Sequence, residues 1–160
     1  MSKYLKLTMA FLFLATFALA QGKKDVKKNG IKSCSEADID NNGKMAPNKK
    51  TVFDKNGEAT EVTEFTKEGA LKVIHKYKYN KDGDEIEEEE YDGRNNLTEK
   101  KITLYNSLGE KTEEQYYDGA GKLTKKNLFV YDKKGLKTER KTVDAAGKVL
   151  VTRKYVYEYK

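Results

Sequence analysis

A repeat with a period of 26 residues constrains this chain more than any other feature of its sequence. One series of aligned stretches reads IDNNGKM, FTKEGAL, YDGRNNL, YDGAGKL and VDAAGKV, and their first residues are Ile39, Phe65, Tyr91, Tyr117 and Val143. A second series with the same period reads FDKNG, YNKDG, YNSLG and YDKKG, and begins at Phe53, Tyr79, Tyr105 and Tyr131. A fixed period of this length is the sequence signature of a repeat architecture.

Both series carry the residues of a tight β-hairpin turn. An aromatic or apolar residue is followed by Asp or Asn, two variable residues and Gly, which suits a type I turn closed by a glycine in the left-handed region. With Gly121 in that position, Asp118 pairs with Lys122 and Tyr117 lies opposite Leu123. The turn residues expected on this basis are Asp54, Gly57, Gly69, Gly83, Asp92, Gly109, Asp118, Gly121, Asp132, Gly135, Asp144 and Gly147.

The segments between the turns have the length and composition of β-strands. They run for about eight residues, are rich in Thr, Val, Ile and Tyr, and show no sustained helical periodicity. The sequence therefore predicts an all-β fold: a repetitive antiparallel meander of about ten strands in a single twisted or curved sheet. Whether that sheet is open, curled or partly closed is left undecided.

An even period predicts that all odd-numbered side chains share one face of the sheet. That face would carry a ladder of four tyrosines, which are Tyr79, Tyr105, Tyr131 and Tyr157. The same register places Ile86 opposite Ile102 and Glu114 opposite Lys126. A weaker copy of the turn, Val26–Gly30, extends the repeat toward the N-terminus.

The first twenty residues have the features of a signal peptide. Lys3 and Lys6 precede an apolar run, and Ala18-Leu19-Ala20 predicts cleavage before Gln21. We therefore expect export to the periplasm, the cell surface or the medium, with no transmembrane segment after cleavage. The expected organisation is a signal peptide at 1–20, a degenerate N-terminal repeat at 21–50, and a β-repeat domain at 51–160 with four repeats and a terminal strand.

Charge is zoned along a very polar chain, of which 36% is charged. Residues 58–121 contain nine basic and 17 acidic residues, whereas residues 122–160 contain twelve basic and four acidic residues. A basic segment can contact nucleic acid or another anionic surface. The export signal argues against nucleic acid as the partner. A solvated face, or ends that attract the middle of a neighbouring chain, would explain the zoning equally well.

The stretch Tyr117–Thr124 resembles the YD repeats of the RHS family. Its sequence, YDGAGKLT, has that family's Tyr-Asp, Gly, basic residue, Leu and Thr, with Lys122 where Arg is usual. Tyr91-Asp92 with Leu97-Thr98 matches the pattern less fully, and MORN-like repeats are the alternative resemblance. The resemblance implies a β-repeat at the cell surface or in an exported compartment. It does not imply toxin delivery, because the chain is too short to form a shell.

The residues needed for catalysis or metal binding are few. Asp38–Gly43 matches the start of a calcium loop, but Lys49 stands where an acidic ligand is required, so a repeat turn explains it better. The only histidine, His75, and the only cysteine, Cys34, are too few for a zinc site. The sequence thus predicts no metal, no cofactor and no enzymatic activity.

The function expected from the sequence is that of an exported binding or interaction module. Its tyrosine ladder would contact a glycan or another surface protein, because Tyr offers an amphipathic contact at low entropic cost. The alternative is a structural envelope protein that self-associates through strand edges, such as the free edge of a terminal strand at Tyr155–Lys160.

Overall fold

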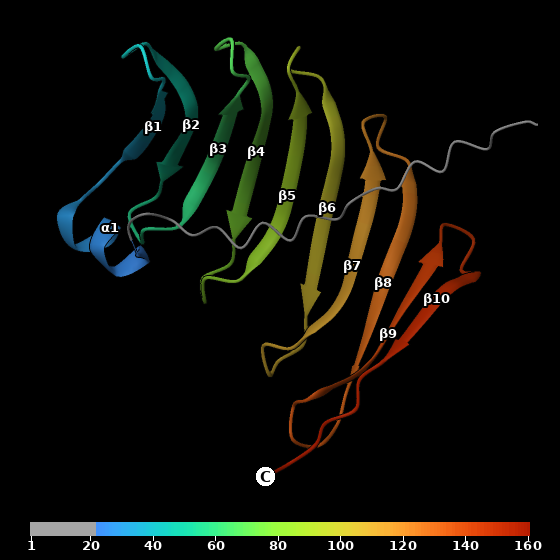
Figure 1. Ribbon diagram of the computed structural model, residues 1–160. Coiled ribbons are helices and arrows are strands. Elements are labelled where there is room, and N and C mark those ends of the chain that lie inside the picture. The colour runs from blue at the N-terminus through green and yellow to red at the C-terminus, as the bar shows by residue number, and fades with distance from the viewer. Residues whose placement is uncertain (1–21) are drawn as a thin grey trace, which may run out of the picture.

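A computed structural model describes residues 22–160 of the chain. The predicted signal peptide and its cleavage site at Gln21 lie outside these residues. The described chain forms one short helix followed by ten strands (Figure 1). The elements are α1 (Lys23–Asn29), β1 (Ser33–Ile39), β2 (Met45–Phe53), β3 (Ala59–Phe65), β4 (Leu71–Tyr79), β5 (Glu85–Asp92), β6 (Leu97–Tyr105), β7 (Lys111–Asp118), β8 (Leu123–Tyr131), β9 (Lys137–Asp144) and β10 (Val149–Lys154).

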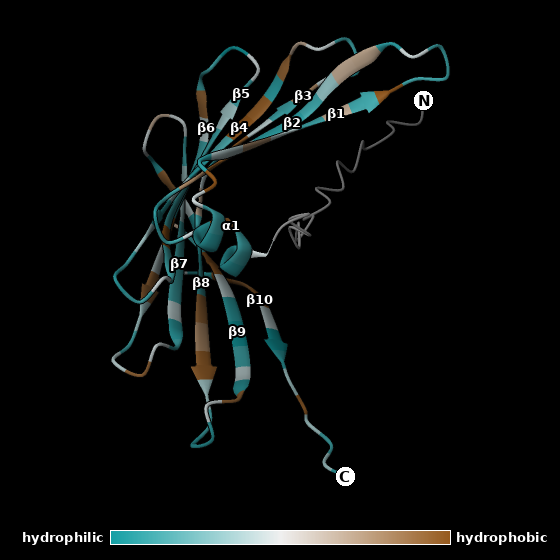
Figure 2. Cartoon of the chain, turned by 90° about the vertical axis from the view of Figure 1, so that its left-hand side faces the viewer, coloured by the Kyte–Doolittle hydropathy of each residue, from teal (hydrophilic) through white to brown (hydrophobic). Residues whose placement is uncertain are grey.

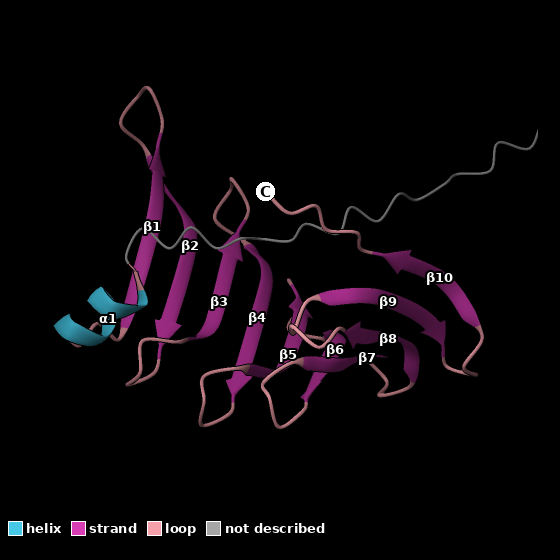
Figure 3. Ribbon diagram, turned by 90° about the horizontal axis from the view of Figure 1, so that it is seen from below, coloured by secondary structure: helices cyan, strands magenta, loops and turns pink. Residues whose placement is uncertain are grey.

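The predicted all-β meander is confirmed. All ten strands lie in one antiparallel sheet in the order in which they occur in the chain, and the sheet does not close into a barrel. Seen from below, the strands rotate progressively from β1 to β10, so the sheet coils (Figure 3). The strands are largely hydrophilic with scattered apolar residues, and no strand is apolar throughout (Figure 2).

The hairpin turns have the geometry that their residues favour. In the turn after β7, Asp118 N donates to Lys122 O at 3.0 Å and Gly121 N donates to Asp118 O at 2.9 Å. Gly121 has a φ of 79°, in the left-handed region, and Tyr117 pairs with Leu123. The Asp118 carboxylate accepts the backbone N–H groups of Ala120 and Lys122. This acceptor role explains why Asp or Asn recurs at this position.

A second irregularity follows every turn, and the sequence analysis missed it. In eight of the nine hairpins the ladder skips the residue that directly follows the closing pair; in the first hairpin it skips Asn48. Threonine occupies five of the skipped positions, and each hydroxyl donates to a backbone carbonyl across the hairpin, as Thr124 does to Tyr116 O at 3.0 Å. Each hairpin therefore contains a β-bulge, and threonine marks five of the nine.

These bulges overturn the prediction that odd-numbered residues share one face. Beyond each bulge the register is displaced by one residue, so an odd position on one strand pairs with an even position on the next. Glu114 lies opposite Asn127 instead of Lys126, and Ile102 lies opposite Glu87 instead of Ile86. Because side chains alternate along a strand and directly paired residues share a face, the two rows of aromatic residues lie on opposite faces.

We name the two faces after one member of each row. The Tyr105 face carries Phe53, Tyr79, Tyr105 and Tyr131 near one row of turns, and includes Val62, Tyr77 and Asn127. The Tyr117 face carries Phe65, Tyr91, Tyr117 and Val143 near the other row, together with their partners Leu71, Leu97, Leu123 and Val149.

The core is thin because the sheet has no second layer. Within residues 22–160 the buried apolar side chains are Val26, Phe53, Val62, Tyr77 and Val143, and the buried polar ones are Thr51, Thr63, Thr103 and Asn127. Most other strand residues are half-buried by their neighbours on adjacent strands. Stability therefore depends on contacts between neighbouring strands, as is typical of repeat proteins.

Two local predictions at the ends of the described chain are wrong. Val26–Gly30 does not form a turn between strands: Val26 is buried on α1, and Gly30 ends that helix with a φ of 62°. The last strand is β10, which ends at Lys154, and Tyr155–Lys160 is not a strand. Neither segment has a neighbouring strand on its outer side. The ladder hydrogen bonds of such a strand would be needed to keep these segments in the β conformation of the repeat.

Candidate functional site

The predicted tyrosine ladder is held by the main chain. The hydroxyl groups of Tyr79, Tyr105 and Tyr131 donate to the carbonyl oxygens of Ala59, Glu85 and Lys111, at 2.8, 3.0 and 2.9 Å. In each pair the acceptor lies twenty residues before the tyrosine. Tyr157 makes the same contact with Lys137 O at 2.7 Å, although it follows the last strand.

Burial of the ladder decreases toward the C-terminus. Burial raises the pKa of Tyr79, Tyr105 and Tyr131, with nearby carboxylates acting in the same direction. Tyr157 is 41% exposed. Each hydroxyl thus has a structural partner, while the rings form an amphipathic row along one edge of the Tyr105 face. Their role in binding remains a prediction.

The middle of the Tyr105 face contains a compact charged cluster. His75 Nδ1 lies 3.3 Å from Glu88 Oε1, and Lys101 contacts both Glu88 and Glu85, the latter at 2.8 Å. Burial raises the pKa of Glu88, but the nearby His75 and the hydrogen bond from Lys101 outweigh it and lower the value to about 2. The nearby carboxylate of Glu88 likewise raises the pKa of His75, against the effect of burial.

The cluster does not assemble a nucleophile with a base. Cys34 lies three strands away from His75 in the same cross-strand row, separated from it by Thr51 and Val62. No group of three or more His, Cys, Asp or Glu residues within 22–160 could hold a metal ion. In the calcium-like stretch, one carboxylate oxygen of Asp40 accepts the N–H groups of Asn42 and Lys44. That carboxylate therefore caps a turn.

Positive charge without ion pairs collects on the Tyr105 face of β8 and β9. No carboxylate of a described residue forms an ion pair with Lys125, Lys137 or Arg140, whereas the lysines of β4–β7 pair extensively. Lys125 Nζ lies 4.3 Å from the centre of the Tyr116 ring, and Lys137 Nζ lies 4.6 Å from that of Phe129. Arg140 lies opposite Phe129 in the ladder.

We call these five residues, Lys125, Lys137, Arg140, Tyr116 and Phe129, the basic aromatic surface. Its cations lie over or beside aromatic rings, which orient a charged group without neutralising it. The sequence shows a basic segment at 122–160 but not this surface, because the bulges decide which lysines share a face with which rings.

The Tyr117 face has a different electrostatic character. Lys78 lies 2.6 Å and Lys100 lies 3.0 Å from the carboxylate of Glu87, and Lys126 lies 3.0 Å from that of Glu113. Cations and carboxylates alternate across the strands here, so the charges largely compensate one another. This face therefore has less unpaired positive charge for an anionic partner than the basic aromatic surface has.

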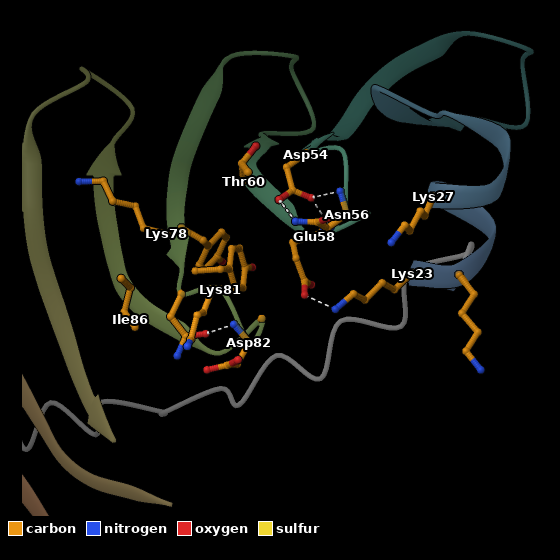
Figure 4. Close-up of a pocket in the computed structure, with 15 residues that line it drawn as sticks. Lys23, Lys27, Asp54, Asn56, Glu58, Thr60, Lys78, Lys81, Asp82 and Ile86 are labelled. Carbon is orange, nitrogen blue, oxygen red and sulfur yellow. Dashed lines mark hydrogen bonds and ion pairs between the residues drawn. The ribbon is translucent and has the colours of Figure 1, made fainter. Parts of the chain in front are cut away.

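A hollow of about 860 Å³ lies between α1 and the turns that follow β2 and β4 (Figure 4). Lys23 reaches across it to an ion pair with Glu58, and Asp54 caps the adjoining turn by accepting the N–H groups of Asn56 and Glu58. A Cβ on Gly57 would lie 2.6 Å from Lys23 O, so α1 packs directly on this turn. The contacts in this hollow hold the helix against the sheet.

Two further findings concern the type of protein. No helix within residues 22–160 has both the length and the hydropathy needed to cross a membrane. No known protein family and no curated protein matches the sequence.

The sheet is similar to parts of several solved structures. One is a protein of unknown function from Bacteroides fragilis, with 14% identity and a TM-score of 0.44 over 80% of this chain and 95% of that one. Another is TarM, with 17% identity and a TM-score of 0.31 over 82% of this chain and 22% of TarM. A third is a Photorhabdus luminescens Tc holotoxin pore, with 10% identity and a TM-score of 0.26 over 75% of this chain and 9% of that one.

The likeness to these structures concerns the β-sheet alone, and no family is confirmed. The prediction that the chain is not an enzyme is corrected by these comparisons. The glycosyltransferases TarM and GtfA/B are among the similar structures, and the chain spans less than a quarter of either.

Proposed function

We propose that this protein is an exported binding module whose basic aromatic surface binds an extended anionic glycan. The observation that carries the proposal is the set of cations without ion pairs, Lys125, Lys137 and Arg140, on one face of two neighbouring strands. The lysines of β4–β7 have carboxylate partners within the sheet, so the cations of the basic aromatic surface are the ones that a chain with regularly spaced anions would pair with.

The aromatic rings favour a glycan over other polyanions. Tyr116 and Phe129 lie beside the cations and are half-buried, so their exposed edges offer apolar area next to positive charge. A sugar ring presents an apolar surface to an aromatic ring, and its carboxylate or phosphate groups reach the cations at the same time. Tyr131, which belongs to the predicted ladder, extends this surface along β8.

Titration of the purified protein with polygalacturonate, observed by calorimetry, tests the proposal. We expect binding that weakens as salt is added, because the contacts are largely between charged groups. Arg140→Gln should weaken it by roughly 10-fold or more, the loss expected for one charge-assisted hydrogen bond. Lys78→Gln is the matched control, because Lys78 lies on the Tyr117 face and already pairs with Glu87.

Three comparison ligands distinguish the alternatives. Dextran, which is neutral, should not bind, whereas equal binding of dextran and polygalacturonate would contradict the role of the cations. Polyglutamate that binds as tightly as the glycan would indicate an acidic protein partner and would refute the role of the sugar. Single-stranded DNA tests the expectation that nucleic acid is not a partner.

A further inference from the structure

Both edges of the sheet are open. No described strand pairs with the outer edge of β1 or with that of β10 (Figure 1). Three consecutive residues of β10 are exposed: Val149, Leu150 and Val151, at 51%, 54% and 53%. An exposed apolar edge strand presents unpaired N–H and C=O groups to another chain.

At the C-terminal edge, residues 155–157 keep the contacts with β9 that a hairpin strand would make. Tyr155 N donates to Thr138 O at 3.0 Å, and Tyr157 makes the ladder contact with Lys137 O. The equivalent segment of β8 continues as a strand to Tyr131, because β9 pairs with it on the other side. Residues 155–157 thus lie along β9 without a neighbour on their outer side.

At the N-terminal edge, β1 is the type of strand that would pair with the outer side of β10. In the 26-residue repeat, Ile39 of β1 corresponds to Phe65 of β3, and both strands run in the direction of β9. Each of β3, β5, β7 and β9 has a strand before it, but β1 has α1 instead. A strand equivalent to β10 therefore fits the outer edge of β1.

We infer that a second copy of this chain occupies the open edge, with β10 and residues 155–157 of one copy pairing antiparallel with β1 of the next. The register of β8 with β9, carried forward by one repeat, places Arg153 opposite Asp38 and Tyr155 opposite Glu36 of the neighbouring copy. Asp38 and Arg153 both lie on the Tyr105 face, so they meet on the same side of the extended sheet.

The charges of the two edges complement each other. β1 carries Glu36 and Asp38, whereas β10 ends with Arg153 and Lys154, and neither of these cations forms an ion pair with another described residue. Oppositely charged residues that face each other across strands favour one register. Because the two contacting edges differ, the interface is heterologous, and the copies would add head to tail into an open chain or a ring.

Charge exchange tests this inference by sedimentation velocity at increasing protein concentration. The purified protein should associate, and Arg153→Asp or Asp38→Arg should each weaken association by roughly tenfold, because a like-charged pair replaces the attraction. An equimolar mixture of the two variants should associate again, as should the double variant. Lys72→Glu, at an exposed cation remote from both edges, is the control.

Cross-linking tests the register itself. In a Cys34→Ser background, Arg153→Cys combined with Asp38→Cys should give disulfide-linked copies. Lys154→Cys combined with Asp38→Cys should not, because residue 154 lies on the opposite face. A protein that stays monomeric at high concentration would overturn the inference. Arg153→Cys alone forming dimers would also overturn it, since two β10 edges would then be pairing. Neither result depends on whether the protein binds a glycan, for which Arg140 is the test residue.

Discussion

The hydrogen bonds of the tyrosine ladder should stabilise the fold in proportion to their burial. Replacing Tyr105 with Phe removes only the hydroxyl that donates to Glu85 O at 3.0 Å and leaves the ring in place. The net contribution of such a bond is about 1 kcal/mol. For a chain of this size that loss lowers the melting temperature by about 3–5 °C.

Tyr157→Phe is the internal control for Tyr105→Phe. It removes an equivalent bond of 2.7 Å, but Tyr157 is 41% exposed at the open edge, so water can replace the lost donor and stability should change little. Tyr79→Phe should cost more stability than Tyr105→Phe, and Tyr131→Phe should cost less, because burial decreases in that order. The three losses should be additive within about 0.5 kcal/mol, because the bonds lie in different hairpins.

Thermal and urea unfolding of the four single variants, with glycan titration of each, decide between the two roles of the ladder. Equal destabilisation by all four variants would contradict the link between burial and bond strength. Unchanged stability together with lost binding in Tyr105→Phe would refute a structural role for the hydroxyl and support recognition by the ladder.

Three other perturbations address the turns, the bulges and the charged cluster. Gly119→Ala should cost about 1–3 kcal/mol in urea unfolding, because its Cβ would lie 2.0 Å from a backbone carbonyl oxygen of the neighbouring hairpin, and unchanged stability would show that the turns are not tightly stacked. Thr124→Val should cost about 1 kcal/mol through loss of the bulge hydrogen bond, whereas Thr124→Ser should cost less because it keeps the hydroxyl. The pKa of His75 is raised in the folded protein, so its ion pair with Glu88 contributes fully below about pH 6.5, the pKa of an unperturbed histidine. That contribution is lost as the pH rises through the higher pKa of the folded protein, so the unfolding midpoint should fall as the pH rises above about 6.5. Glu88→Gln should flatten that profile, and an unchanged slope in that variant would assign the titration to another group.

The sequence was sufficient to predict the strands and the turns because both are encoded locally. Asp118 and Gly121 determine a turn whose geometry depends only on the five residues it contains, and the closing pair of Tyr117 with Leu123 follows from it. Repetition of that signal every 26 residues then specifies the order of the strands.

The assignment of side chains to faces failed because the bulge residue of each hairpin, a threonine in five of the nine, was taken for an ordinary strand residue. The Thr124 hydroxyl donates to a backbone carbonyl oxygen, while its backbone has no partner in the ladder. The residue type alone does not distinguish such a threonine from one that is paired. The same displacement hid the basic aromatic surface, since Lys125 and Tyr116 share a face only after the bulge is counted. Gly119 was also treated as variable, although its neighbour in the next hairpin leaves no room for a side chain.

The bulges have a consequence for how a protein of this kind can change its length. Each repeat contains two hairpins, so the two one-residue displacements within it cancel, and residues 26 apart return to the same side of the sheet. Duplicating or deleting a whole repeat in the gene would leave every remaining side chain on the same face of the sheet as before. Deleting the single bulge residue Thr124 would instead move the side chains on one side of the bulge to the opposite face of the sheet. The number of strands can therefore vary in steps of two without redesigning the rest of the protein.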